Sequence, residues 1–150
     1  MALTNIDRLK FLAVLLGATV VAFKTQFVAD SGSIVYSNLF IKILIAIFSY
    51  GIAFFVLYKK KVRNLLLYFI SLAVLGTIIN TVCVTIFEGY SDYWFNADSV
   101  ANSTGLLQDY LKLSVLRLLI LVPINSLIFL IVAVPVYLLM QLINKQTNNY

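Results

Sequence analysis

Long apolar runs separated by short polar segments dominate the chain. The runs cover residues 9–28, 40–58, 64–87 and about 115–143. A helix crosses the ~30 Å of hydrocarbon with about 20 predominantly apolar residues, so each run is long enough to span a membrane. The pattern predicts an all-α, polytopic membrane protein, a single four-helix transmembrane domain over residues 1–150, with an outer loop over residues 88–114.

Composition supports a lipid environment. Hydrophobic residues make up 62% of the 150 residues and charged residues only 11%, whereas soluble domains carry about 25% charged residues. So few charges cannot cover a water-facing surface, and the length leaves no room for a separate soluble domain. The single cysteine, Cys83, excludes an intrachain disulfide, and the chain has no histidine.

The distribution of charge predicts the orientation. With the N-terminus in the cytoplasm, seven cations and one acid fall on the inner side, against four cations and five acids on the outer side. Lys and Arg accumulate in cytoplasmic segments of membrane proteins, so we expect both termini in the cytoplasm. The net charge of +5 then reflects topology and implies no direct nucleic-acid partner.

The most basic segment is the short turn between the second and third runs. It contains Lys59, Lys60, Lys61 and Arg63. Such a turn provides positive charge that stops translocation and contacts lipid headgroups. The alternative interpretation is a docking site for a soluble cytoplasmic protein.

The fourth run is too long for one straight crossing. Upstream of it, residues 104–119 carry apolar residues spaced among polar ones, which predicts a short amphipathic helix in the interface before the last span. Pro123 and Pro135 lie within the span. Each removes a backbone hydrogen bond and favours a kink.

Aromatic and acidic residues gather at the start of the predicted outer loop. Tyr and Trp favour the membrane interface, where the ring meets acyl chains and the polar edge meets water. The segment therefore indicates an interfacial anchor, or else a recognition patch for an external ligand or protein. The residues are Glu88, Tyr90, Asp92, Tyr93, Trp94 and Phe95.

Two asparagines lie inside the third and fourth runs. Asn80 and Asn125 are predicted at matching depth, ~10–12 Å below the outer boundary, and facing the bundle interior. A hydrogen bond between them would contribute ~0.6 kcal/mol, up to about 2. Thr77, Thr81 and Thr85 extend this side of the helix at helical spacing. The stripe holds helices together or lines a polar path in an oligomer.

Three cations fall near the outer ends of predicted spans: Lys24, Lys42 and Arg117. Long basic side chains there extend to the interface by snorkelling. The alternative is pairing with Glu88, Asp92 or Asp109, which would bind the loop to the bundle. No acid lies within a predicted span, which argues against a proton-coupled transporter.

The residues for catalysis are not present in a recognisable pattern. The sequence has no H-E-x-x-H or G-x-S-x-G motif, no Cys or His cluster and no phosphate-binding Gly-rich loop. We therefore expect a protein that is not an enzyme, with no catalytic residue, no cofactor and no metal site.

The overall plan resembles two groups of small bacterial membrane proteins. The resemblance lies in the "KKKVR" turn, the loop from Glu88 to Lys112 and the last span ending "VPVYLLMQLINKQ". These features are similar to those of colicin A-type immunity proteins and of KwaA, the membrane subunit of the Kiwa antiphage system. The first resemblance implies a ligand in the membrane-inserted helices of a toxin. The second implies a homo-oligomer that senses the envelope and works with a soluble effector.

These features lead to one main functional hypothesis. The protein is expected in the bacterial inner membrane as a defence or immunity subunit that senses or counters a phage or toxin through its outer loop. It would signal to a soluble cytoplasmic partner, with the lipid bilayer and further copies of itself as its other partners. The alternatives are a small oligomeric channel or transporter, and a structural subunit of a membrane complex.

Overall fold

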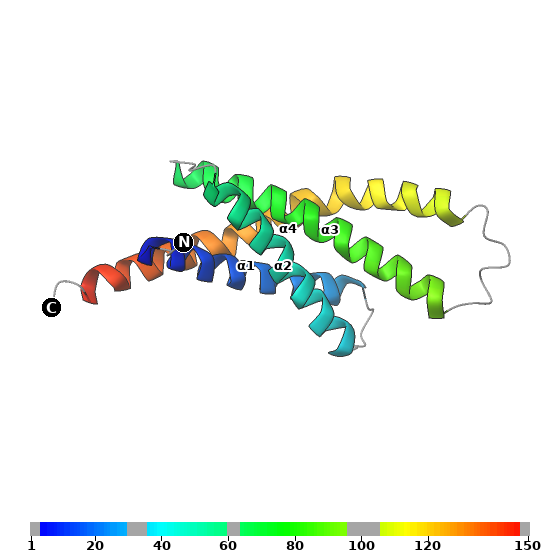
Figure 1. Cartoon of the computed structure of the whole chain (residues 1–150), viewed down its shortest axis with the longest axis horizontal. Coiled ribbons are helices and arrows are strands. Elements are labelled where there is room, and N and C mark those ends of the chain that lie inside the picture. Colours follow the sequence, from blue (N-terminus) through cyan, green and yellow to red (C-terminus); the bar gives the residue numbers. More distant parts are fainter. Residues whose placement is uncertain (1–3, 30–35, 60–63, 96–105, 148–150) are drawn as a thin grey trace.

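The computed structural model describes residues 4–29, 36–59, 64–95 and 106–147. Within them the chain is all-α and forms four helices: α1 (Asn5–Ala29), α2 (Tyr36–Lys59), α3 (Leu65–Phe95) and α4 (Leu106–Thr147). The helices run alternately up and down, so that the start of α1 and the end of α4 lie at the same end of the bundle (Figure 1). We call this the terminal end and the opposite end the distal end.

Two of the helices begin at residues whose side chains cap them. The Thr4 hydroxyl oxygen accepts a hydrogen bond from the backbone amide of Asp7 at 3.3 Å, and Asn64 Oδ1 accepts from the amides of Leu66 and Leu67 at 3.0 and 3.3 Å. The first amides of a helix have no partner within it, so a side-chain oxygen at the cap stabilises the start. Thr4 and Asn64 therefore stabilise the starts of α1 and α3.

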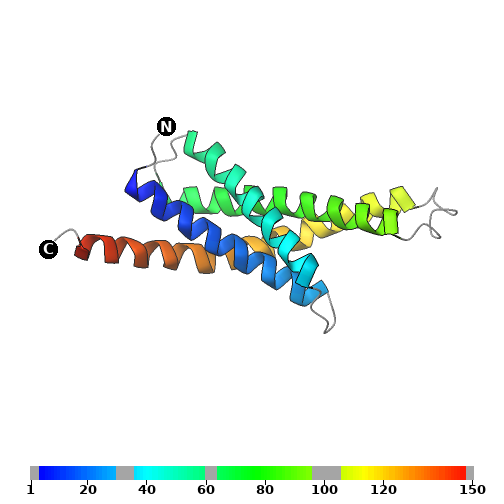
Figure 2. The same ribbon diagram turned by 60° about the horizontal axis from the view of Figure 1, so that its bottom comes forward.

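The four helices form a ring in which each helix packs against its neighbours in the chain and α1 also packs against α4. Toward the distal end, α3 and α4 extend well beyond α1 and α2 (Figure 2). The bundle thus has a four-helix body and a two-helix extension.

The loop predicted over residues 88–114 is largely wrong. α3 continues to Phe95 and α4 already begins at Leu106. Helix propagation adds one backbone hydrogen bond per residue once a helix exists, and no proline or run of glycines interrupts these extensions. The separate amphipathic helix is also not observed, because residues 106–147 form one helix that contains both Pro123 and Pro135.

The outward faces of the helices are apolar. Large hydrophobic side chains are exposed on all four helices, among them Leu16 on α1, Phe48 on α2, Ile86 on α3 and Leu119 on α4. Three helices contain a segment long and apolar enough to cross a membrane: Leu39–Lys59, Leu65–Phe87 and Leu118–Lys145. The described side chains of α1 include the charged residues Asp7, Arg8, Lys10 and Lys24. The described part of α1 does not meet the same requirement of length and apolar composition.

Candidate functional site

Two aromatic rings stacked between two glycines fill the centre of the bundle. The rings of Tyr50 from α2 and Phe129 from α4 lie 4.6 Å apart and nearly parallel. A Cβ on Gly76 of α3 would overlap the Tyr50 ring, and a Cβ on Gly17 of α1 would come within 2.8 Å of the Phe129 ring. The order Gly76, Tyr50, Phe129, Gly17 therefore joins all four helices, and we call these four residues the central stack.

The hydroxyl of Tyr50 continues into a short chain of hydrogen bonds. Tyr50 Oη and Thr77 Oγ1 are 2.7 Å apart, and Ser126 donates to Thr77 Oγ1 over 3.3 Å. Thr77 is fully buried and Ser126 nearly so. These contacts fix how far along the bundle α2, α3 and α4 are placed relative to one another.

Buried polar side chains continue from this point toward the distal end. Asn80 and Thr81 lie one turn beyond Thr77 on α3, and Asn125 precedes Ser126 on α4, which runs the opposite way. These positions therefore share one layer of the bundle. We call the buried and half-buried polar residues of this half the polar cluster: Lys24, Lys42, Thr77, Asn80, Thr81, Thr85, Asn125 and Ser126.

The side chain of Lys24 points into the polar cluster. Its Nζ donates a hydrogen bond to Asn125 Oδ1 at 3.3 Å, joining α1 to α4. The Cα–Cβ bond of a helical residue tilts toward the N-terminus of its helix, which for α1 is the terminal end. Because Asn125 is placed only one turn beyond Phe129, the ammonium reaches back toward the bundle centre. It does not snorkel away from it, as one interpretation predicted.

Two buried polar atoms of the same layer lack a hydrogen-bond partner. They are Asn80 Oδ1 and Thr81 Oγ1. Asn80 is 2% exposed and Thr81 5% exposed. An unsatisfied buried acceptor or donor costs about 1–3 kcal/mol, and such a group calls for an explanation such as a ligand or an ordered water.

The two asparagines singled out from the sequence are both buried within the bundle. The carbonyl oxygen of Asn125 accepts from Lys24, whereas that of Asn80 has no partner. A direct hydrogen bond between the two amides stays a prediction. The threonine stripe does lie inside: Thr77, Thr81 and Thr85 are all buried.

Lys42 occupies a second buried position in the polar half. It is 7% exposed. Lys42 precedes Tyr50 by eight residues on α2, and Thr85 follows Thr77 by eight on the antiparallel α3. The contact between Tyr50 and Thr77 therefore places Lys42 level with Thr85, ~12 Å from the central stack.

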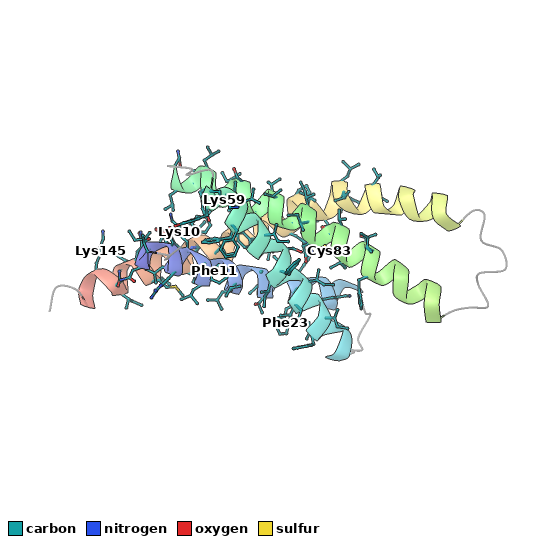
Figure 3. All side chains as sticks on the ribbon, viewed as in Figure 1. Lys10, Phe11, Phe23, Lys59, Cys83 and Lys145 are labelled. Carbon is teal, nitrogen blue, oxygen red and sulfur yellow. The ribbon has the colours of Figure 1, made fainter. Side chains whose placement is uncertain are left out.

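The other half of the bundle, between the central stack and the terminal end, is aromatic. Phe54 packs edge-on against Phe11 at 5.1 Å and against Tyr68 at 6.3 Å, and Phe69 lies 5.5 Å from Tyr137. Lys10 lies over the Tyr68 ring, 5.3 Å from its centre. Lys10, Lys59 and Lys145 all lie toward the terminal end (Figure 3).

The remaining site residues predicted from the sequence lie partly outside the described side chains. Glu88, Tyr90, Asp92, Tyr93, Trp94 and Phe95 belong to the last turns of α3, and only their backbone is described. Lys59 is exposed at the end of α2, while Lys60, Lys61 and Arg63 lie outside the described residues. The recognition patch and the partner dock therefore stay predictions.

Chemically, the polar cluster is made of groups that can bind a ligand. It offers an ammonium, two amides and several hydroxyls, and among the described residues no group of His, Cys, Asp and Glu is arranged to hold a metal ion. No known protein family, curated protein or solved structure matches the chain.

Proposed function

We propose that the protein is a four-span subunit of the bacterial inner membrane, with both termini in the cytoplasm, that is not an enzyme. It senses or counters a phage or toxin at the cell envelope and signals to a soluble cytoplasmic partner. The defence role follows from the resemblance to immunity proteins and to KwaA, and the membrane role follows from the bundle.

One observation carries the membrane placement. Large hydrophobic side chains cover the outside of the helices, while Asn80, Asn125 and Thr77 are buried between them. This is the reverse of a soluble bundle, whose exposed faces are polar. It is the arrangement expected where lipid surrounds the helices and polar groups must be satisfied internally.

The placement of cations supports the orientation. Lys10, Lys59 and Lys145 lie toward the terminal end, where α1 begins and α4 ends. Cytoplasmic segments are rich in Lys and Arg, so the terminal end is assigned to the cytoplasm. The distal extension of α3 and α4 then lies on the outer side, where an envelope signal arrives.

The central stack argues against a channel through a single copy. Among the described residues, the buried Asn and Thr side chains lie in the distal half, and the rings of Tyr50 and Phe129 separate them from the aromatic half, whose buried polar atoms include the Tyr68 hydroxyl. A conducting path would have to displace these rings or run between copies of the chain. Conductance of purified protein in planar bilayers would favour the channel over the sensor.

The proposal is tested first by topology. Reporters active only in the cytoplasm or only outside it are fused after Tyr150 and inserted between Asn96 and Gly105. We expect cytoplasmic activity from the first fusion and external activity from the second. The opposite pattern, or both reporters on one side, would refute the orientation.

The defence role is tested in cells. Bacteria that express the chain with its neighbouring genes are challenged with a panel of phages and pore-forming toxins, and survival is compared with a strain lacking the chain. Replacing Lys59, Lys60 and Lys61 together by Gln should release a co-purifying soluble protein and abolish protection. Unchanged survival without the chain across the panel would contradict the role and favour a structural subunit.

A further inference from the structure

We propose that the polar cluster binds a phosphate group that carries a hydroxyl donor, at the layer formed by Lys24, Asn80, Thr81 and Asn125. The phosphate of an anionic lipid headgroup and free inorganic phosphate share this chemistry. The inference rests on the membrane placement proposed above and is independent of the defence role.

The first step is the charge of Lys24. Its ammonium is turned inward and hydrogen-bonded to a neutral amide oxygen, 3.3 Å away. A charge drawn into an apolar bundle is costly unless an opposite charge accompanies it. An amide dipole alone does not neutralise the charge, so the position favours a bound anion.

The second step is that the described acid lies far away. Asp7 is the one acid whose side chain the structure describes, and it lies near the terminal end, 3.8 Å from Lys10. On α3, the backbone of Glu88 lies seven residues beyond Thr81, which is ~10 Å along the axis. On α4, Asp109 precedes Asn125 by sixteen residues, or ~24 Å. The backbones of both acids thus lie beyond Thr81 and Asn125 along the bundle axis, toward the distal end.

The third step identifies the ligand chemistry. Lys24 offers donors to an oxyanion, and the Thr81 hydroxyl, which has no partner, offers another. Asn80 Oδ1 is an acceptor without a partner, so a complementary ligand must also donate. A hydroxyl-bearing phosphate meets both requirements: the glycerol headgroup of phosphatidylglycerol and dihydrogen phosphate each combine acceptor oxygens with O–H donors.

Lys24 is the most exposed of the four residues in the layer. Asn80, Thr81 and Asn125 are buried, but Lys24 is only half-buried. The ammonium is therefore the first group that a ligand meets, and the two unsatisfied atoms lie deeper. This favours a headgroup that reaches in from the surrounding lipid.

The experiment measures thermal stability of the purified full-length protein against two probes. Phosphatidylglycerol is titrated into nanodiscs of phosphatidylcholine, and inorganic phosphate is titrated into protein in neutral detergent at constant ionic strength. Two variants remove the site: Lys24→Gln deletes the charge, and Asn125→Asp supplies a carboxylate beside Lys24. Lys145→Gln, near the exposed end of α4, is the matched control.

We expect wild type and Lys145→Gln to gain stability with at least one probe, and both site variants to lose the response or to need roughly tenfold more probe. Asn125→Asp should also melt higher than wild type without any probe, which shows that it folds. A response to the lipid alone assigns the site to a headgroup, and a response to phosphate assigns it to the free ion as well.

The inference is overturned if wild type responds to neither probe, or if Lys24→Gln and Lys145→Gln lose the response equally. Such a result leaves the proposed function intact, provided that the topology reporters give the expected pattern. The opposite reporter pattern, or both reporters on one side, would instead refute the proposed function, whatever the binding experiment shows.

Discussion

The two halves of the bundle have interiors filled by different kinds of side chains. On the terminal side of the central stack, Phe11, Phe54 and Tyr68 pack ring against ring. On the distal side, amides, hydroxyls and lysine are buried beside small apolar residues such as Val21 and Ala46, and two of the polar atoms have no partner. The same four helices thus enclose an aromatic half and a polar half.

This difference in composition indicates which half mainly stabilises the bundle and which half is expected to serve its function. Aromatic contacts need no exact partner and contribute about 0.5–1.5 kcal/mol per pair beyond burial. Buried polar groups stabilise only when they are paired, and an unpaired group costs about as much as a pair contributes. The aromatic half therefore holds the bundle together, and the polar half keeps groups that stability alone does not explain.

The largest effect is expected from removing a ring of the central stack. Phe129→Ala takes away a fully buried ring that touches Tyr50 and fills the space beside Gly17. We expect a loss of roughly 2–3 kcal/mol in the free energy of unfolding, at or below the low end for Phe→Ala because the unfolded helices still contact lipid. Unfolding in mixed micelles measures the change.

The control for this change is Phe48→Ala on α2. Phe48 is 68% exposed on the apolar outside of the bundle, so its removal leaves no cavity. An equal loss of unfolding free energy in the two variants would show that the central stack stabilises the bundle no more than an exposed ring does. The central stack would then not mark a boundary between the two halves.

A somewhat smaller effect is expected from adding one methyl group to the central stack. Gly76→Ala places a Cβ against the Tyr50 ring, and the ring cannot move aside without disturbing Phe129. Overpacking of this kind costs about 1–3 kcal/mol. Thermal unfolding in detergent should show a clear drop in melting temperature.

Gly51→Ala tests whether that drop comes from contact. A Cβ on Gly51 meets nothing within 4 Å, while alanine is favoured over glycine in a helix by up to about 1 kcal/mol. Gly51→Ala should therefore be neutral or stabilising. A loss of stability in both variants would mean that helix propensity or lipid contact, and not the central stack, decides the outcome.

The third-largest effect on the free energy of unfolding, about 1 kcal/mol, is expected in the polar half. Asn125→Ala removes the acceptor of the Lys24 hydrogen bond and leaves the ammonium unpaired, whereas Asn80→Ala removes an oxygen that has no partner. We expect Asn125→Ala to cost about 1 kcal/mol or more and Asn80→Ala to be nearly neutral. Free energies of unfolding in phosphate-free neutral detergent measure both.

The double variant decides whether the two asparagines pair. Additive losses mean that they act independently, as the Lys24 contact suggests, and a coupling above about 0.5 kcal/mol means that they contact each other. If Asn80→Ala costs as much as Asn125→Ala, then its oxygen has a partner and the proposed phosphate site loses one of its supports.

The sequence predicted the helical class and the three long apolar helices because apolar runs of this length have few other structures available. The end of the third helix was misjudged, since residues 88–95 look like a loop by polarity, but they contain no proline and α3 continues through Gly89. The buried positions of Asn80 and Thr77 followed from helical spacing. Helical spacing shows which residues share one face of a helix, so these positions could be predicted without knowing how the helices pack.

The central stack and the direction of Lys24 were beyond reach of the sequence. Gly17 and Gly76 lie 59 residues apart, and their contacts with Phe129 and Tyr50 depend on how four helices pack. Lys24 looked like an interfacial lysine because such residues usually snorkel. Its inward turn depends on Asn125, which lies 101 residues away in the chain.

The smallest effect is expected at the border between the halves, in the hydrogen bond between Tyr50 and Thr77. Tyr50→Phe keeps the stacked ring and removes only the hydroxyl, and Thr77→Val removes the other partner. Hydrogen bonds between membrane helices contribute about 0.6 kcal/mol on average, so the double-mutant cycle should give a coupling of that size. Because Ser126 also donates to Thr77 Oγ1, Thr77→Val alone should cost more than Tyr50→Phe. A coupling near zero would mean that the ring alone joins the two halves, and that the polar cluster begins beyond Thr77.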